Sequence, residues 1–208
     1  MERSFWKDRW REGKIGFHEG TPNRYLVEHS AWLADCRRIL VPLCGKTEDL
    51  AYLASLGHDV VGVELVEDAV KQFFDEHGTV AETETSGDLV IYRAGAITVI
   101  AGDFFQVTRA HTGPIDGIFD RAAMVALPPD IRARYITHLR ILAADATREL
   151  LVSIEYPPEA SSGPPFSIEE PEVRATFAGA TLTVVGGGLD PQGRLEGRMF
   201  ERCYTISF

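Results

Sequence analysis

A repeated order of short apolar runs and helical segments constrains the fold of this chain more than any other feature. Residues 38–43 (RILVPL) and 59–64 (DVVGVE) are apolar runs of strand length, and both are predicted to be buried strands. Lys46–Leu56 and residues 66–77 follow them with apolar side chains at helical spacing, and Gly57 is placed to cap the first helix. Strand–helix units of this size predict parallel strands whose faces are covered by helices.

The rest of the 208-residue chain continues this pattern and ends in two successive strands. Apolar runs predict further strands at residues 89–93, 96–101, 115–119, 150–156, 180–185 and 199–207, and helical spacing predicts helices at 129–143 and 169–177. Gly186–Gly188 is predicted to join the last two strands, and residues 157–167 are too rich in breakers for a regular element. The simplest assembly is one α/β domain, residues 1–208, with an antiparallel hairpin at one sheet edge.

Charge and composition exclude several classes of protein. The chain has 31 acidic and 21 basic residues, so its formal charge of −10 argues against a broad surface for nucleic acid or an anionic membrane. No stretch approaches the roughly 20 apolar residues of a membrane span, and the start lacks the apolar core of a signal peptide, so a cytoplasmic protein is expected. Cys36, Cys44 and Cys203 lack CxxC spacing, which predicts free thiols and no metal site.

A glycine turn and an acidic residue suggest a nucleoside site. Gly45 follows the first predicted strand, and Glu64 ends the second one 19 residues later. This spacing suits a turn that approaches a nucleoside and a carboxylate that accepts from its ribose hydroxyls. The turn has one glycine where a dinucleotide fingerprint has three, and an acid at a strand end is often simply solvated. Among nucleoside cofactors, S-adenosylmethionine, which carries no phosphate, fits best.

A second motif ends the strand predicted at residues 96–101. Asp103 could accept a hydrogen bond from the amino group of an adenine, and Phe104 could pack on its ring. The alternative is a turn in which Asp103 is a cap and Phe104 belongs to the core. The residues alone leave both interpretations open.

Several longer stretches resemble one known family. They are FWKDRWREGKIGFHEG, LVPLCGKTEDLAYLASLGHDVVGVE, GDFF, DRAAMVALPPDIRARY and GPPFS, which span roughly residues 5–168. In this order and spacing they resemble the thiopurine S-methyltransferases, especially the bacterial members. The resemblance implies a class I methyltransferase fold, which is a seven-stranded, mostly parallel, Rossmann-like sheet with helices on both faces. It also implies S-adenosylmethionine as cofactor and a small thiol-like methyl acceptor.

The resemblance assigns residues to the two ligands. Those implied for the methionine and ribose parts of the cofactor are Leu43, Gly45 and Glu64, and those implied for its adenine are Gly102, Asp103 and Phe104. Those implied on the acceptor side are His18, Arg121, Pro165 and Phe166.

The N-terminal segment, residues 1–35, is expected to be a lid over the occupied site. Trp6 and Trp10 are four residues apart and therefore share one face of a short helix, and Phe17 follows them. The resemblance adds these three aromatic side chains to the cofactor site, where an aromatic face can contact a sulfonium. The alternative is that they only fasten the N-terminus to the core.

Arg121 is the expected catalytic residue, near both cofactor and acceptor. An arginine holds an anion by charge-assisted hydrogen bonds and stays protonated, which suits ionised thiols and chalcogen anions. The alternative is a salt bridge at a helix start, with Asp120 as the N-cap.

The resemblance weakens after Ser167, and Pro157 and residues 186–199 depart from the family pattern. This leaves open the acceptor, which is expected to be a small chalcogen compound, an aromatic thiol, or a selenium or tellurium oxyanion. Two alternatives remain: a methyltransferase for halide, thiocyanate or hydrosulfide ions on the same scaffold, and a non-catalytic protein that binds S-adenosylmethionine. A monomer is expected.

Overall fold

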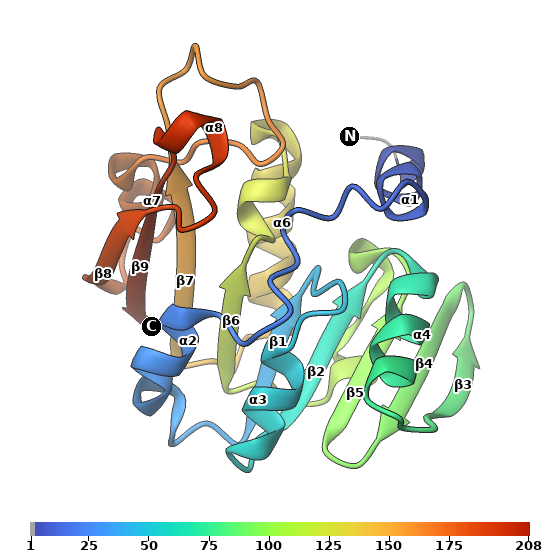
Figure 1. The fold of residues 1–208 in the computed structure, drawn as a ribbon. Coiled ribbons are helices and arrows are strands. Elements are labelled where there is room, and N and C mark those ends of the chain that lie inside the picture. The colour runs from blue at the N-terminus through green and yellow to red at the C-terminus, as the bar shows by residue number, and fades with distance from the viewer. Residues whose placement is uncertain (1–2) are drawn as a thin grey trace.

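Every strand of the described chain, residues 3–208, pairs into one sheet in the computed structural model (Figure 1). The first two residues of the predicted lid segment lie outside the described range. The nine strands are β1 (Arg38–Pro42), β2 (Asp59–Glu64), β3 (Glu82–Ser86), β4 (Leu89–Ala94), β5 (Ile97–Ala101), β6 (Gly117–Arg121), β7 (Arg148–Glu155), β8 (Thr181–Leu189) and β9 (Phe200–Ser207).

The strand order is β3-β4-β5-β2-β1-β6-β7-β9-β8. The central strands β5, β2, β1, β6 and β7 are parallel, while β9 and β8 are antiparallel additions at one edge. The expected mostly parallel sheet with a C-terminal antiparallel pair is therefore confirmed. The seven strands that the resemblance implies are present as β5, β2, β1, β6, β7, β9 and β8, and the antiparallel β3–β4 hairpin extends the sheet to nine at the other edge.

Helices cover both faces of the sheet, as expected (Figure 1). The α-helices are α1 (Arg3–Arg11), α2 (Arg24–His29), α3 (Asp49–Ser55), α4 (Glu67–Glu76), α5 (Arg109–Thr112), α6 (Pro129–Leu142), α7 (Glu170–Thr176) and α8 (Arg194–Gly197). The short 3-10 helices are η1 (Ser30–Leu33), η2 (Phe104–Gln106) and η3 (Met124–Ala126).

Each face of the sheet has its own apolar core. On one face, buried side chains of α2, η1, α3 and α4 pack on the strands, including Leu26, Leu50 and Phe73. On the other face, Tyr135 of α6 and Phe177 just after α7 are buried in the same apolar cluster. The helices thus leave the ends of the parallel strands free for the loops that carry polar side chains.

Gly186–Gly188 belongs to β8, so the prediction that these glycines join the last two strands is wrong. A Cβ on Gly186 would lie 3.1 Å from the Tyr25 ring, and a Cβ on Gly187 would lie 2.9 Å from the Phe200 ring. The glycines therefore let two aromatic rings approach a strand, which is another common use of glycine in sheets. The connection is instead the stretch 190–199, which includes α8.

Three smaller differences concern one strand that was not predicted and the bounds of two elements that were. Strand β3 was not predicted, because its sequence ETETS is exposed and has no apolar alternation. Helix α3 begins at Asp49 and not at Lys46, and β6 runs over Gly117–Arg121 and not over residues 115–119. The later start of α3 leaves residues 43–48 as a loop after β1, and β6 ends on Arg121.

The described residues contain three buried free cysteines, Cys36, Cys44 and Cys203. Within residues 3–208, no helix has both the length and the apolar character to cross a bilayer. The same part of the chain has no cluster of three or more His, Cys, Asp or Glu side chains that could hold a metal ion.

Candidate active site

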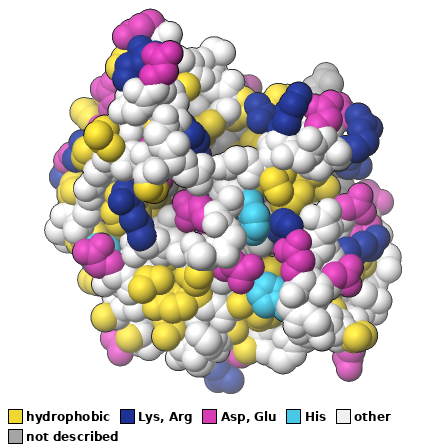
Figure 2. Space-filling model, in the orientation of Figure 1, with side chains coloured by type: hydrophobic (Ala, Val, Ile, Leu, Met, Phe, Trp, Pro, Cys, Tyr) yellow, Lys and Arg dark blue, Asp and Glu magenta, His cyan; other side chains and the backbone are white. Residues whose placement is uncertain are grey.

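A cavity of about 480 Å³ lies at the carboxyl ends of the parallel strands. Much of its lining comes from the loops after β1, β2, β5 and β6 and from the N-terminal segment, and α6, β7 and the loops after β7 and β8 supply most of the rest. In the space-filling view the surface is hollowed between the regions of α1 and α8 (Figure 2). This volume lies in the range of about 300–1,000 Å³ that is usual for small-molecule sites, and this edge of an open α/β sheet is where such sites form.

Glu64 and Gly45 meet at the cavity, as their spacing predicts. The Gly45 amide donates to Oε2 of Glu64 at 2.8 Å, and the Val66 amide donates to Oε1 at 2.7 Å. Glu64 is only 6% exposed, and burial raises the pKa of its carboxyl although these amides oppose the shift. Glu64 and Leu43 line the cavity, whereas Gly45 does not. Gly45 has a φ of +58° and contacts Glu64 through its backbone amide.

The GDFF motif forms the cap and the core contact of the second interpretation, and Asp103 and Phe104 of the motif also line the cavity. Asp103 caps η2 by accepting from the Phe105 amide at 3.0 Å, and it also lines the cavity. Phe104 is buried, packs with its ring centroid 5.1 Å from that of Tyr135, and lines the cavity as well. Gly102 is not part of the lining; its φ is +145°, and a Cβ there would lie 2.4 Å from Leu89.

The aromatic side chains of the N-terminal segment line the cavity. Trp6 and Trp10 both belong to α1, and each ring meets the Phe17 ring edge-on, with centroids 6.0 and 5.7 Å apart. Trp10 is buried and packs with Val66 and Ala69. The segment therefore both lines the cavity and is fastened to the core.

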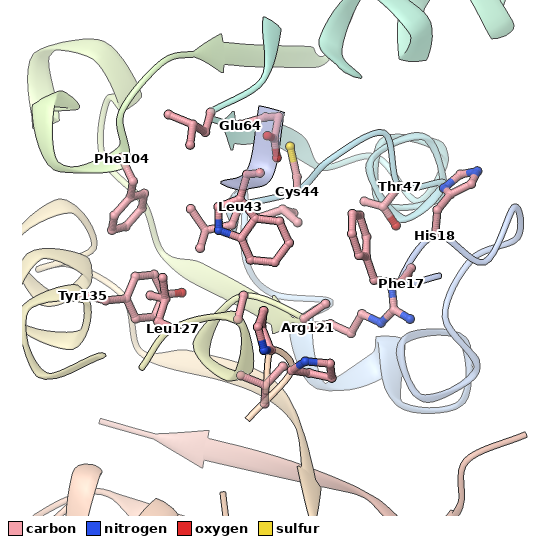
Figure 3. A pocket seen from close by; sticks show the side chains of 18 of the residues that line it. Phe17, His18, Leu43, Cys44, Thr47, Glu64, Phe104, Arg121, Leu127 and Tyr135 are labelled. Carbon is pink, nitrogen blue, oxygen red and sulfur yellow. The ribbon is translucent and has the colours of Figure 1, made fainter. Parts of the chain in front are cut away.

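Arg121 lies at the end of β6, toward the opposite side of the cavity from Glu64 (Figure 3). Its guanidinium donates to the Phe17 carbonyl at 2.7 Å and forms an ion pair with Glu19. The preceding Asp120 accepts from the Met124 amide at 3.1 Å, at the start of η3, and from the Tyr135 hydroxyl at 2.6 Å. The salt bridge of the alternative interpretation is present, and so is the position at the cavity, but the N-cap of η3 is Ala123 and not Asp120.

Of the other residues expected on the acceptor side, two line the cavity and one does not. His18 and Pro165 line the cavity, and burial lowers the pKa of the His18 imidazole. Phe166 is not in the lining, because its ring packs over Gly163, where a Cβ would approach it to 2.5 Å. All the predicted site residues except Gly45, Gly102 and Phe166 therefore line the cavity, and Gly45 contacts it through Glu64.

Several cavity residues were not predicted. Tyr135 and Ile131 lie four apart on α6 and have the apolar spacing of ordinary core residues. Asp49 is buried and accepts from the Asn23 amide at 2.6 Å and from the Thr47 hydroxyl at 2.7 Å. Only the cluster of polar residues just after Gly45 could have indicated Thr47 and Asp49, because their partner lies in the N-terminal segment.

The strand order, the helices on both faces and the cavity at this edge define a class I methyltransferase fold. Solved structures agree: a methyltransferase from Anabaena variabilis superposes with a TM-score of 0.68 at 14% identity, covering 99% of this chain and 94% of that one. Magnesium protoporphyrin IX methyltransferase from Synechocystis, solved with bound S-adenosylmethionine, gives 0.64 at 16% identity, covering 99% and 96%. At these identities the likeness concerns the fold.

Sequence comparison gives the family. The model of the thiopurine S-methyltransferase family matches residues 1–191. A thiopurine S-methyltransferase from Pseudomonas aeruginosa is 45% identical over 181 residues, which is 86% of this chain and 83% of the relative. Another from Pseudomonas fluorescens is 39% identical over 216 residues, covering 100% and 97%. The chain therefore belongs to the thiopurine S-methyltransferase family, and it is an S-adenosylmethionine-dependent S-methyltransferase.

The cavity residues fit this cofactor. The buried Glu64 carboxylate can accept from ribose hydroxyls, and the buried ring of Phe104 offers an apolar surface to a base. The cofactor supplies a methyl group on a positively charged sulfur.

Proposed function

We propose that the protein transfers the methyl group of S-adenosylmethionine to a small acceptor whose negative charge lies on sulfur or another chalcogen, and that Arg121 holds this anion. The observation that carries the proposal is the Arg121 guanidinium, which is only 10% exposed and lines the cavity. A buried arginine stays protonated and binds anions by charge-assisted hydrogen bonds. A cation in this position favours an ionised thiol over a neutral one.

An ionised acceptor needs no general base. The attacking atom approaches the methyl carbon from the side opposite the departing sulfur, so positioning supplies much of the catalysis. His18, the titratable imidazole in the lining, has a lowered pKa and is therefore mostly neutral at pH 7. The chemistry of the lining thus suits electrostatic positioning by Arg121 better than proton removal.

The cofactor is proposed to lie on the Glu64 side of the cavity. Glu64 would accept from the ribose, the Leu43–Gly45 loop would contact the methionine part, and Gly102–Phe104 would border the adenine. In this proposal Trp6, Trp10 and Phe17 form a lid that excludes water. Their supporting features are their place in the lining and their mutual ring contacts.

The acceptor need not be a thiopurine, although the relatives carry that name. The stretch 190–199 departs from the family pattern, and its Arg194 lines the cavity. Small aromatic thiols and selenium or tellurium oxyanions are the class proposed, as distinct from the hydrosulfide, thiocyanate and halide ions of the alternative. Family membership does not favour a methyltransferase for halide, thiocyanate or hydrosulfide ions, nor a non-catalytic binding protein.

The proposal is tested by replacing Arg121. Arg121→Lys keeps the charge but loses the planar guanidinium, and Arg121→Ala loses both. With an ionised thiophenol, loss of one or more charge-assisted hydrogen bonds of about 1.5–3 kcal/mol lowers kcat/KM about tenfold or more in Arg121→Ala. A neutral alkyl thiol is expected to lose less, and cofactor affinity is expected to change less than kcat/KM.

The melting temperature of each variant is measured beside its kinetics. A folded Arg121→Ala variant that loses the same factor with both thiols would contradict the anion-holding role. A loss of activity that follows the loss of folded protein would instead support a purely structural salt bridge.

The surroundings of the enzyme are part of the same proposal: a cytoplasmic monomer that binds no nucleic acid and no membrane. Three buried free thiols and a charge of −10 support it. Light scattering during size-exclusion chromatography tests the oligomeric state, and a mass near twice 23.0 kDa would contradict the monomer.

A further inference from the structure

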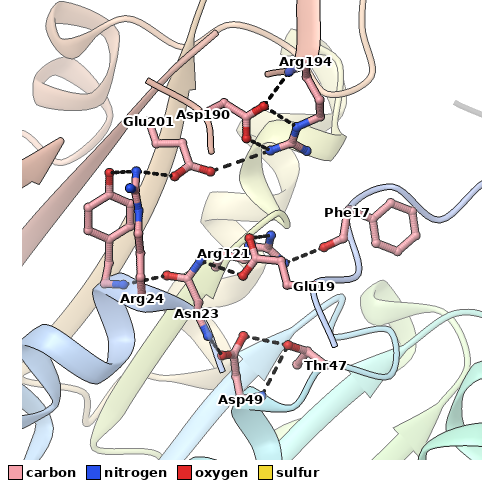
Figure 4. A network of polar contacts seen from close by, with 11 residues as sticks. Phe17, Glu19, Asn23, Arg24, Thr47, Asp49, Arg121, Asp190, Arg194 and Glu201 are labelled. Atoms are coloured by element: carbon pink, nitrogen blue, oxygen red, sulfur yellow. Dashed lines mark hydrogen bonds and ion pairs between the residues drawn. The ribbon is translucent and has the colours of Figure 1, made fainter. Parts of the chain in front are cut away.

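The guanidinium of Arg121 already holds an anion from the chain itself. One terminal nitrogen donates to the Phe17 carbonyl, and the other donates to Oε1 of Glu19 (Figure 4). The two side chains are 10% and 17% exposed, so this ion pair is largely shielded from water. Any acceptor anion that binds Arg121 therefore meets a site whose positive charge is already neutralised.

Glu19 is held in this position by its own neighbours. Its second oxygen, Oε2, accepts from the Asn23 side-chain amide at 3.2 Å. Asn23 is buried, caps α2, and is fixed through its backbone amide to the buried carboxylate of Asp49. The Glu19 carboxylate is thus a built part of the site, since both of its oxygens have partners and the group behind it is rigid.

Glu19 also borders a second cavity, which shares Glu201 with the lining of the main one. This second cavity has a volume of about 230 Å³ and is lined by Glu19, Asn23, Arg24, Gln192 and Glu201 and three neighbouring residues. This space gives the Glu19 side chain room to rotate away from Arg121. Glu19 therefore contacts Arg121 and at the same time lines a cavity that can receive its side chain.

We propose that Glu19 competes with the acceptor anion for Arg121, leaving the arginine when the anion binds and returning after methyl transfer. This inference rests on the proposed function. In the transfer, a lone pair of the thiolate forms the new sulfur–carbon bond, and the electron pair of the breaking carbon–sulfur bond remains on the sulfur of the cofactor. No proton moves, and the thiolate becomes a neutral thioether that no longer competes for Arg121.

The physical reason is the cost of two anions beside one shielded cation. Like charges in a water-poor site disfavour each other, and a buried charge is tolerated only while it is paired. An acceptor anion and the Glu19 carboxylate thus exclude one another at Arg121, whereas a neutral acceptor or the neutral product leaves the ion pair intact. Glu19 would then lower the affinity for anionic acceptors and promote release of the product.

The test is the binding of ligands to the enzyme saturated with S-adenosylhomocysteine, measured by titration calorimetry. Glu19→Gln keeps the size of the side chain and removes the charge, and its one carbonyl oxygen can still accept from Arg121 or from Asn23. An ionised thiophenol is expected to bind about tenfold more tightly to this variant, because its competitor for Arg121 no longer carries a negative charge. The methyl thioether of the same compound is expected to bind within about twofold of its wild-type affinity, because it does not compete for the arginine.

Glu28→Gln is the matched control, because Glu28 is exposed on α2 and its replacement changes the net charge equally. Glu19→Asp is the second variant: it keeps the charge on a shorter side chain and should also bind the thiophenol more tightly. Unchanged or weaker anion binding in a folded Glu19→Gln variant overturns the competition. Equally tighter binding of thiophenol and thioether also overturns it, because that pattern indicates a loosened lid. If Arg121→Ala binds the thiophenol as tightly as the wild type, the proposed function itself fails.

Discussion

Replacing Glu64 by glutamine tests how this cavity holds the cofactor. Both oxygens of Glu64 accept backbone amides, from Gly45 at 2.8 Å and from Val66 at 2.7 Å, and the residue is 6% exposed. In Glu64→Gln the side chain would keep one carbonyl oxygen as an acceptor for one amide and for a ribose hydroxyl. It would lose the charge and one acceptor.

The expected loss can be worked from these contacts. A hydrogen bond to a charged group contributes about 1.5–3 kcal/mol, so Glu64→Gln should weaken the binding of S-adenosylhomocysteine by about 10- to 150-fold. Glu64→Ala should weaken it further and also destabilise the fold. In that variant the amides of Gly45 and Val66 lose their acceptor, at about 1–3 kcal/mol for each group that stays buried and unpaired.

Calorimetric titration with S-adenosylhomocysteine, beside thermal unfolding, measures both effects. Glu67→Gln is the control, because Glu67 is an acidic residue on α4 that bonds to the Tyr92 hydroxyl and is not part of the cavity lining. A folded Glu64→Gln variant with a Kd within about twofold of the wild type, which is well under the effect of one such hydrogen bond, would refute the reasoning and remove Glu64 from the cofactor site.

Two further predictions concern the lid and a buried acid. Amide exchange at residues 5–20 is expected to slow when S-adenosylhomocysteine is added; equal protection with and without it would contradict the lid and favour a purely structural segment. Burial raises the pKa of Asp120 from 3.8 to about 6. The folded protein therefore loses about 3 kcal/mol of stability in all as the pH rises through this range and the buried carboxyl ionises. The unfolding free energy of Asp120→Asn minus that of the wild type, both measured in urea, should therefore be about 2 kcal/mol higher at pH 7 than at pH 4. Parallel pH profiles of the two proteins would count against this.

The central part of the fold could be predicted because its sequence signals are local. The β1 and β2 strands are continuous apolar runs, and α4 has apolar residues every three or four positions. Gly57, which follows α3, has a φ of +95°. The meeting of Gly45 and Glu64 followed from topology alone, since the ends of adjacent parallel strands share one edge.

The parts that failed depend on contacts between distant segments. Gly186 and Gly187 resemble a turn in sequence, and their role became visible only with the rings of Tyr25 and Phe200 beside them. The ion pair between Arg121 and Glu19 joins residues 102 positions apart, and no local pattern indicates it. The family resemblance assigned Arg121 to the site, but it did not reveal that the Glu19 carboxylate is already paired with this arginine.

The acceptor can be tested apart from the cofactor. S-adenosylhomocysteine release is measured with an ionised heteroaromatic thiol, iodide, thiocyanate and hydrosulfide, each supplied separately with S-adenosylmethionine. The account predicts release with the thiol at a kcat/KM well above that of the three inorganic ions, together with a stoichiometric methyl thioether. Release with the inorganic ions alone, or tight cofactor binding without release from any acceptor, would contradict the account.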